Sequence, residues 1–179
     1  LNKEREQSVL TFPVVTAAML TENGQCKDHN FAQKLAEQKA AGNSFFIYLS
    51  DSADSLASCC RLRNEISDNT FFKSLELVFK SKKVSFFQLR LKNEKLSKKI
   101  LISKKIIKIC RKYSVKFLVN DDPILALKVN ADGCHLGQKD MSIIKAKKIL
   151  KNKIIGITCH NSIKLAKNAL MNGANYIAV

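Results

Sequence analysis

No uninterrupted apolar run in this sequence approaches the roughly 18 residues that a membrane-spanning helix requires. The start of the chain also lacks the basic stretch followed by an apolar one that marks a secretory signal. These two absences argue against a membrane partner and predict a cytoplasmic location. Hydrophobic residues make up 46% of the 179 residues, an ordinary share for a globular protein with room for one core.

A Cys-x-x-Cys pair, the usual signature of a structural metal site, is missing as well. The six cysteines stand at positions 26, 59, 60, 110, 134 and 159. Three of them fall inside expected strands or helices, where a disulfide framework does not form. We therefore expect free thiols, as in a reducing compartment.

Acidic residues become scarce in the second part of the chain. Residues 1–70 carry seven basic and nine acidic side chains, a net charge of −2, whereas residues 71–179 carry twenty-four and six, a net charge of +18. This shift predicts a boundary near residue 70. A basic module that binds nucleic acid is one alternative. It is not favoured, because aromatic stacking motifs are absent and most lysines have the spacing of a solvated helix face.

From residue 70 onward, short apolar runs alternate with amphipathic stretches. Expected strands are 84–90, 116–119, 132–136, 154–157 and 175–179, and expected helices are 70–81, 94–113, 141–151 and 162–172, with a shorter one after Asp122-Pro123. In the longest helix we place Leu96, Ile100, Ile107 and Cys110 on the buried face. This alternation predicts a parallel sheet with right-handed crossovers.

Polar side chains follow two of the expected strands. Asn120 and Asp121 end one strand, and Asp140 comes shortly after the next. Because the carboxyl ends of parallel strands form one rim, we expect these three residues to meet there. Carboxylates without a thiolate or imidazole cluster suit Mg²⁺ better than zinc. Asp122 is better placed to cap a helix.

The strand at 84–90 carries Gln88, Arg90 and Lys92 on one side, because alternate residues of a strand share a face. An Arg fork beside a Lys point charge suits the oxygens of a pyrophosphate. Solubilising charges at a strand end are the alternative interpretation.

Taken together, these residues resemble thiamine phosphate synthase, a (β/α)8-barrel family. The motifs that carry the resemblance are Gln88–Lys92, Asn120-Asp121, His135–Asp140 and Gly156–His160, in the family's order. The resemblance runs from about residue 67 to residue 179 and implies an incomplete barrel. Five strands are counted where a closed barrel needs eight, with 45–49 as a stand-in for the first and the last two expected beyond residue 179.

The resemblance also implies a reaction. The family joins aminohydroxymethylpyrimidine pyrophosphate to thiazole phosphate with Mg²⁺, which gives thiamine phosphate and pyrophosphate. By this resemblance, the catalytic residues are Arg90 and Lys92; the substrate-binding residues are Gln88, Leu89, Arg90, Leu91, Lys92, Asn120 and Thr158; and the metal ligands are Asp121 and Asp140. The alternatives are a thiazole tautomerase-like protein and an inactive chimeric or truncated product. For His135, packing inside the barrel and a chemical role both stay open. The oligomeric state is not predicted.

Residues 1–70 have a different resemblance. Leu10–Ala18 and Ser58–Asn64 are similar to segments of the anaerobic ribonucleotide reductase large subunit, in which a cysteine pair supplies a thiyl radical. The glycyl-radical segment of that family is absent, so we expect Cys59 and Cys60 to be unpaired thiols. We accordingly predict a reductase-like α+β fragment, unrelated to the rest, over residues 1–70 and an incomplete synthase-like barrel over residues 71–179.

Overall fold

The computed structural model describes residues 14–16, 45–50, 69–80, 84–92 and 94–179. Cys59, Cys60 and most of the two reductase-like stretches lie outside these ranges. No helix within them is long and apolar enough to cross a membrane.

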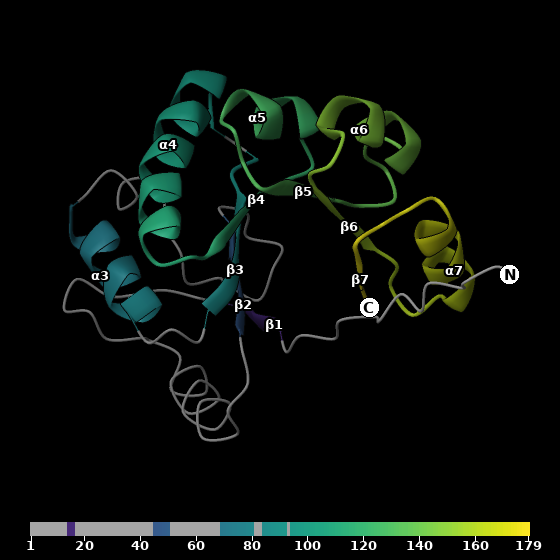
Figure 1. The fold of residues 1–179 in the computed structure, drawn as a ribbon, viewed down its shortest axis with the longest axis horizontal. Helices are drawn as coiled ribbons and strands as arrows, with labels where there is room; N and C mark the ends of the chain where they lie inside the picture. Colours follow the sequence, from purple (N-terminus) through teal and green to yellow (C-terminus); the bar gives the residue numbers. More distant parts are fainter. Residues whose placement is uncertain (1–13, 17–44, 51–68, 81–83, 93) are drawn as a thin grey trace, which may run out of the picture.

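Within the described residues, seven strands form one sheet in which each strand pairs in parallel with the next one along the chain (Figure 1). They are β1 (Val14–Thr16), β2 (Phe45–Ser50), β3 (Val84–Arg90), β4 (Lys116–Asn120), β5 (Gly133–Leu136), β6 (Ile154–Thr158) and β7 (Tyr176–Ala178). Parallel strands in strict chain order are the arrangement of a (β/α)-barrel rather than of a doubly wound sheet. The predicted partial barrel is therefore confirmed.

Helices connect the strands from β3 onward. They are α4 (Leu96–Lys112), α5 (Pro123–Lys128), α6 (Ile143–Leu150) and α7 (Ile163–Met171), and α3 (Asn69–Lys80) precedes β3. In Figure 1, α4, α5 and α6 lie along one side of the curved run of strands. The sheet residues that face the helices, such as Phe87 and Phe117, are fully buried and stack with ring centroids 6.2 Å apart. The core thus lies between sheet and helices, and the other sheet face carries polar residues such as Gln88 and Asn120 beside the buried Leu118.

Strand β2 pairs in parallel with β3, with Tyr48 opposite Gln88. The segment 45–49 therefore lies next to β3, in the position expected for a stand-in for the first strand. Strands of the first seventy residues thus continue the sheet of the second part, although the domain boundary near residue 70 stays a prediction.

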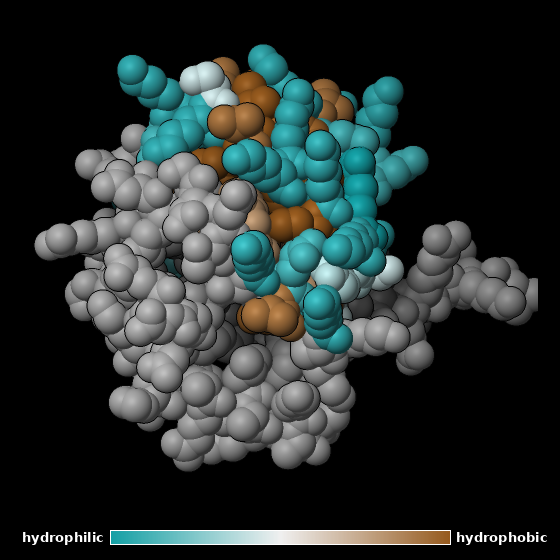
Figure 2. All heavy atoms as spheres, turned by 90° about the vertical axis from the view of Figure 1, so that its left-hand side faces the viewer, coloured by the Kyte–Doolittle hydropathy of each residue, from teal (hydrophilic) through white to brown (hydrophobic). Residues whose placement is uncertain are grey.

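The buried face of α4 differs from the predicted one at its start. Leu96 is 53% exposed, whereas Ile102, Ile106 and Ile107 are buried together with Cys110. Leu96 is the first residue of the helix, beyond the reach of the sheet, so its apolar character does not place it in the core. The lysines of α4 at 104, 105, 108 and 112 are exposed. Figure 2 shows the corresponding side of the molecule, where hydrophilic side chains gather with hydrophobic ones between them.

Two connections from a helix to the next strand, α5 to β5 and α7 to β7, repeat the same geometry. Asn130 and Gly173 have φ values of +55° and +85°, the left-handed conformation that ends a helix. Two residues later, Asp132 exchanges two hydrogen bonds with Phe117: the Phe117 amide donates to the Asp132 carboxylate, and the Asp132 amide donates to the Phe117 carbonyl, both at 2.9 Å. Asn175 makes the same pair of bonds with Ile155, at 2.9 and 2.8 Å. Each residue ties a new strand to the previous one.

Candidate active site at the carboxyl ends of the strands

The Gln88 and Asn120 side chains lie in contact on the face of the sheet away from the helices. Gln88 is only 3% exposed, and its Nε2 donates a hydrogen bond to Oδ1 of Asn120 on the neighbouring strand. This bond orients both amides. Leu89 and Leu91 flank Arg90 in sequence, but their side chains are buried in the core. Of the residues predicted to bind substrate, these two could offer only backbone atoms.

Arg90 and Lys92 stand where β3 ends. Arg90 is the last residue of the strand and is half-buried, whereas Lys92 is exposed. Lys92 lies close enough to Asp121 for its positive charge to act on that carboxylate and lower its pKa. Lys92 therefore lies near the Asn120-Asp121 motif.

Asp121 follows β4 in a left-handed turn with φ of +65°. Its amide donates a 2.7 Å hydrogen bond to the His135 carbonyl on β5, which fixes the turn against the next strand. Burial and the nearby Asp140 carboxylate raise the pKa of Asp121, while Asn120 and Lys92 oppose that rise. Left-handed backbone favours Asp and Asn over most other residues, so this position accommodates a carboxylate with little strain.

Asp140 comes from the loop after β5. Its Oδ2 accepts a 2.7 Å hydrogen bond from the Gly137 amide, and a Cβ at Gly137 would lie only 3.0 Å from that oxygen. The glycine therefore lets the loop fold tightly enough to bring the Asp140 carboxylate near that of Asp121. Asn120, Asp121 and Asp140 meet at one rim in the structure.

The carboxylate pair Asp121–Asp140 is the group that could hold a metal. Burial and the neighbouring Asp140 carboxylate raise the pKa of Asp121, and a bound cation would relieve the repulsion between the two carboxylates. Among the described residues no cluster of three or more His, Cys, Asp or Glu side chains is present, which does not fit zinc. Mg²⁺ fits, because it is held through one or two carboxylates and completes its octahedron with water and substrate phosphates.

His135 lies inside the sheet face, 8% exposed, between two hydroxyl groups. Its Nδ1 lies 2.8 Å from Oη of Tyr176, and its Nε2 lies 2.7 Å from Oγ1 of Thr158. Burial lowers the pKa of His135 to about 4, so the imidazole is neutral at physiological pH. Burial raises the pKa of the Tyr176 phenol, which therefore stays protonated.

Two residues of this site, Tyr176 and Gln138, are not among those predicted from the sequence. Tyr176 was expected only as part of a strand, and its contact with His135 depends on which residues of β5, β6 and β7 stand side by side. Gln138 belongs to the His135–Asp140 motif but was given no role, and its Nε2 donates to the Thr158 carbonyl. Its position inside the motif was the available signal for it. Cys134 and Cys110 are buried free thiols, as predicted.

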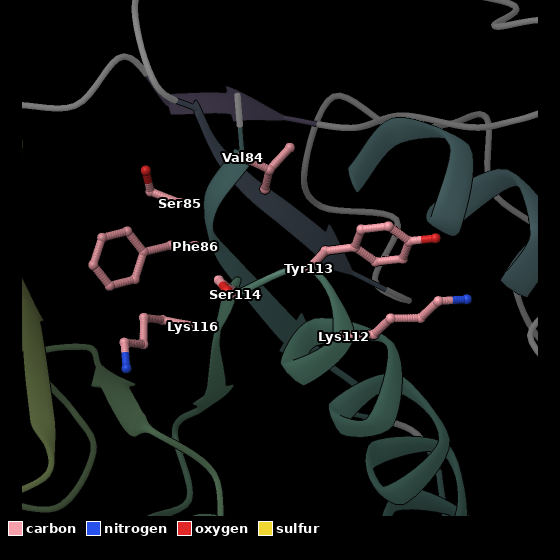
Figure 3. Close-up of a pocket in the computed structure, with 7 residues that line it drawn as sticks. All are labelled: Val84, Ser85, Phe86, Lys112, Tyr113, Ser114 and Lys116. Atoms are coloured by element: carbon pink, nitrogen blue, oxygen red, sulfur yellow. The ribbon is translucent and has the colours of Figure 1, made fainter. Parts of the chain in front are cut away.

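One small cavity, of about 30 Å³, adjoins this rim and has Leu89, Leu91, Val119 and Asn120 among its lining residues. A cavity of about 620 Å³ lies at the opposite, amino ends of β3 and β4, where side chains from the start of β3 face the end of α4 (Figure 3). It is lined by Val84, Ser85, Phe86, Lys112, Tyr113, Ser114 and Lys116. In barrel enzymes the chemistry takes place at the carboxyl ends, so this cavity is not the candidate site.

The fold and the rim together define an α/β-barrel protein with a set of polar and charged side chains at the carboxyl ends of its strands. A family model described as thiamine monophosphate synthase matches residues 59–179. The chain therefore belongs to the thiamine monophosphate synthase family.

Relatives of this chain carry the corresponding names. A thiamine-phosphate synthase of Pelagibacter ubique is 67% identical over 115 residues, which are 64% of this chain and 56% of that protein. One of Marinobacter nauticus is 42% identical over 92 residues, 51% of this chain and 41% of that protein. The chain thus spans about half the length of these curated relatives.

Solved structures agree with the fold. A thiamine phosphate pyrophosphorylase from Pyrococcus furiosus matches with a TM-score of 0.58 and 31% identity, over 73% of this chain and 56% of that one. An Escherichia coli aldolase matches 97% of this chain and 66% of its own, with a TM-score of 0.56 and 10% identity. The second match concerns the fold alone, and its span includes β1 and β2.

Proposed function

We propose that the chain catalyses the family reaction, the joining of aminohydroxymethylpyrimidine pyrophosphate to thiazole phosphate with release of pyrophosphate. The observation that carries the proposal is the carboxylate pair Asp121–Asp140 with Lys92 beside it, at the rim where β3, β4 and β5 end. A site for a pyrophosphate leaving group needs both kinds of charge. The carboxylates hold a cation, and the lysine meets phosphate oxygens directly.

In this proposal Arg90 and Lys92 bind the pyrophosphate and are catalytic. The bond between the pyrimidine methylene carbon and the pyrophosphate oxygen breaks, so negative charge grows on the departing oxygen. Fixed positive side chains stabilise that charge more in the transition state than in the ground state, and this difference accelerates the reaction. Arg90 supplies a planar fork and Lys92 a single compact charge.

The remaining side chains orient the substrate. Gln88 and Asn120 are tied to each other by a hydrogen bond, so they offer preset amide groups to the pyrimidine. Thr158 offers a hydroxyl at the end of β6. Asp121 and Asp140 would hold Mg²⁺, which when bound offsets pyrophosphate charge. The reaction as written requires no side chain to abstract a proton. For this reason no residue is assigned the role of general base.

Steady-state kinetics of the purified chain test the proposal. With both substrates and Mg²⁺, we expect formation of thiamine phosphate, and we expect Lys92→Gln to lower kcat/KM for the pyrimidine pyrophosphate by about 10- to 150-fold. That range corresponds to the roughly 1.5–3 kcal/mol of a hydrogen bond to a charged group. Lys95→Gln is the matched control, because Lys95 is an exposed lysine three residues away with no assigned role. Equal kinetics for Lys92→Gln and the control, or no product from the unaltered chain, would contradict the proposal.

A further inference from the structure

Three side chains on neighbouring strands form a continuous hydrogen-bonded series, Tyr176–His135–Thr158. Both ring nitrogens of His135 are used, Nδ1 by the Tyr176 hydroxyl at 2.8 Å and Nε2 by the Thr158 hydroxyl at 2.7 Å. The imidazole is buried, and its ring lies 5.5 Å from the Tyr176 ring between centroids. Of the three, only Thr158 has an assigned role in the proposed reaction.

The series depends on a glycine between its members. In the sheet, His135 stands opposite Gly156, and Gly156 stands opposite Tyr176. A Cβ at Gly156 would lie 2.0 Å from Cζ and 2.4 Å from Oη of Tyr176. The phenol therefore passes over β6 through space that only glycine leaves open, and so reaches the histidine two strands away.

We propose that Tyr176 and His135 are positioning residues that set the direction of the Thr158 hydroxyl hydrogen. The Tyr176 O–H donates to Nδ1, Nε2–H donates to Oγ1 of Thr158, and the Thr158 O–H is left to donate to an acceptor on the pyrimidine pyrophosphate. The kinetic part of this inference rests on the proposed function.

The direction of the series follows from the chemistry of its members. A neutral imidazole has one N–H donor and one acceptor nitrogen, so one hydroxyl must donate to it and the other must accept from it. The phenol is the more acidic of the two hydroxyls and therefore the better donor. With the opposite tautomer, the Thr158 hydroxyl would donate its hydrogen to His135 and would offer the substrate only lone pairs. Lone pairs cannot bind phosphate oxygens or an unprotonated ring nitrogen, whereas an O–H can.

Nitrogen-15 NMR of the histidine side chains tests the tautomer without any substrate. His135→Gln identifies the His135 signals by their loss. In the unaltered chain we expect a protonated Nε2 and an unprotonated Nδ1, and Tyr176→Phe should shift the signals toward the other tautomer. Tyr113→Phe is the control, because Tyr113 lies at the end of α4, away from the rim. A protonated Nδ1 in the unaltered chain, or no change in Tyr176→Phe, would overturn the proposal.

A double-mutant cycle tests the effect on Thr158. We expect Tyr176→Phe to lower kcat/KM for the pyrimidine pyrophosphate about 2- to 13-fold, the worth of one hydrogen bond of roughly 0.5–1.5 kcal/mol. Thr158→Val should lower it at least as much and Thr158→Ser less. In the Thr158→Val background, Tyr176→Phe should have no further effect, because coupled residues are not additive. Effects that multiply would overturn the coupling. A chain without turnover would refute the proposed function, while the NMR result would still decide the tautomer.

Discussion

Replacing Asp121 by asparagine should stabilise the chain without a divalent cation and destabilise it, relative to the unaltered chain, when Mg²⁺ is present. The substitution removes one charge from the pair Asp121–Asp140 and keeps the shape of the side chain. It also suits the backbone, because φ at this position is +65° and asparagine tolerates that conformation. Alanine would add backbone strain to the loss of charge.

The magnitude follows from the burial of Asp121 and from the general strength of repulsion between like charges. Two unit charges about 4 Å apart repel by about 1 kcal/mol in bulk water and about 4 kcal/mol near a protein surface. Asp121 is only half-buried and Lys92 offsets part of the repulsion, so we take the lower end. Asp121→Asn should therefore raise the free energy of unfolding in chelator by about 1 kcal/mol, or about 2–4 °C in Tm.

The pH dependence has a defined sign. The pKa of Asp121 is raised in the folded chain, so the stability contributed by this group is greatest at low pH and is lost as pH rises through the folded pKa. The advantage of Asp121→Asn should accordingly be full at neutral pH and vanish as pH falls.

Thermal unfolding in chelator and in Mg²⁺ measures both effects. At a Mg²⁺ concentration about ten times its Kd, the unaltered chain should gain about 1.4 kcal/mol and the variant little, so the order of stability inverts. Asp122→Asn is the matched control: it removes the adjacent charge, and asparagine replaces the Asp122 cap of α5, which accepts from the Leu125 amide at 2.9 Å. Equal Mg²⁺ stabilisation of Asp121→Asn and the unaltered chain would refute the metal assignment. A loss of stability in chelator would refute the repulsion.

Two further predictions concern the buried part of the site. The pKa of His135 is lowered to about 4 from an ordinary 6.5, so the stability that the neutral imidazole contributes is full above pH 6.5 and is lost as pH falls toward 4, by up to about 3 kcal/mol. Urea unfolding measured against pH should show this loss in the unaltered chain and not in His135→Gln. Parallel pH curves for the two proteins would contradict the prediction. Gly156→Ala places a Cβ 2.0 Å from the Tyr176 ring and should reduce the free energy of unfolding by about 1–3 kcal/mol in the same assay, whereas an unchanged value would show that the ring can move away.

Much of the fold could be predicted from local patterns. Strand β3 has the predicted bounds, because its apolar run is flanked by lysines and ends in alternating polar residues. Helix α5 begins as predicted, with Asp122 as its cap and Pro123 in the first turn. The partial barrel followed from the regular alternation of strands and helices and from the order of the four motifs.

What the sequence could not provide depends on contacts between distant residues. The bond between His135 and Tyr176 joins residues 41 positions apart and requires the pairing of three strands. The two open interpretations of His135 could not be separated without that pairing. Leu96 is apolar at a helical spacing, yet it lies at the end of α4, where nothing covers more than half of it. Periodicity gives the face of a helix but not how far along the helix the core extends.

The side chains of Asp132 and Asn175 give the described part of the chain the character of a linear array. Each of these residues bonds to the beginning of the strand just before its own and to no more distant unit through that pair of bonds. Stability in such an array is a sum of unit and nearest-neighbour terms, as it is in repeat proteins. These bonds therefore hold β4 to β5, and β6 to β7, without requiring the sheet to close into a ring.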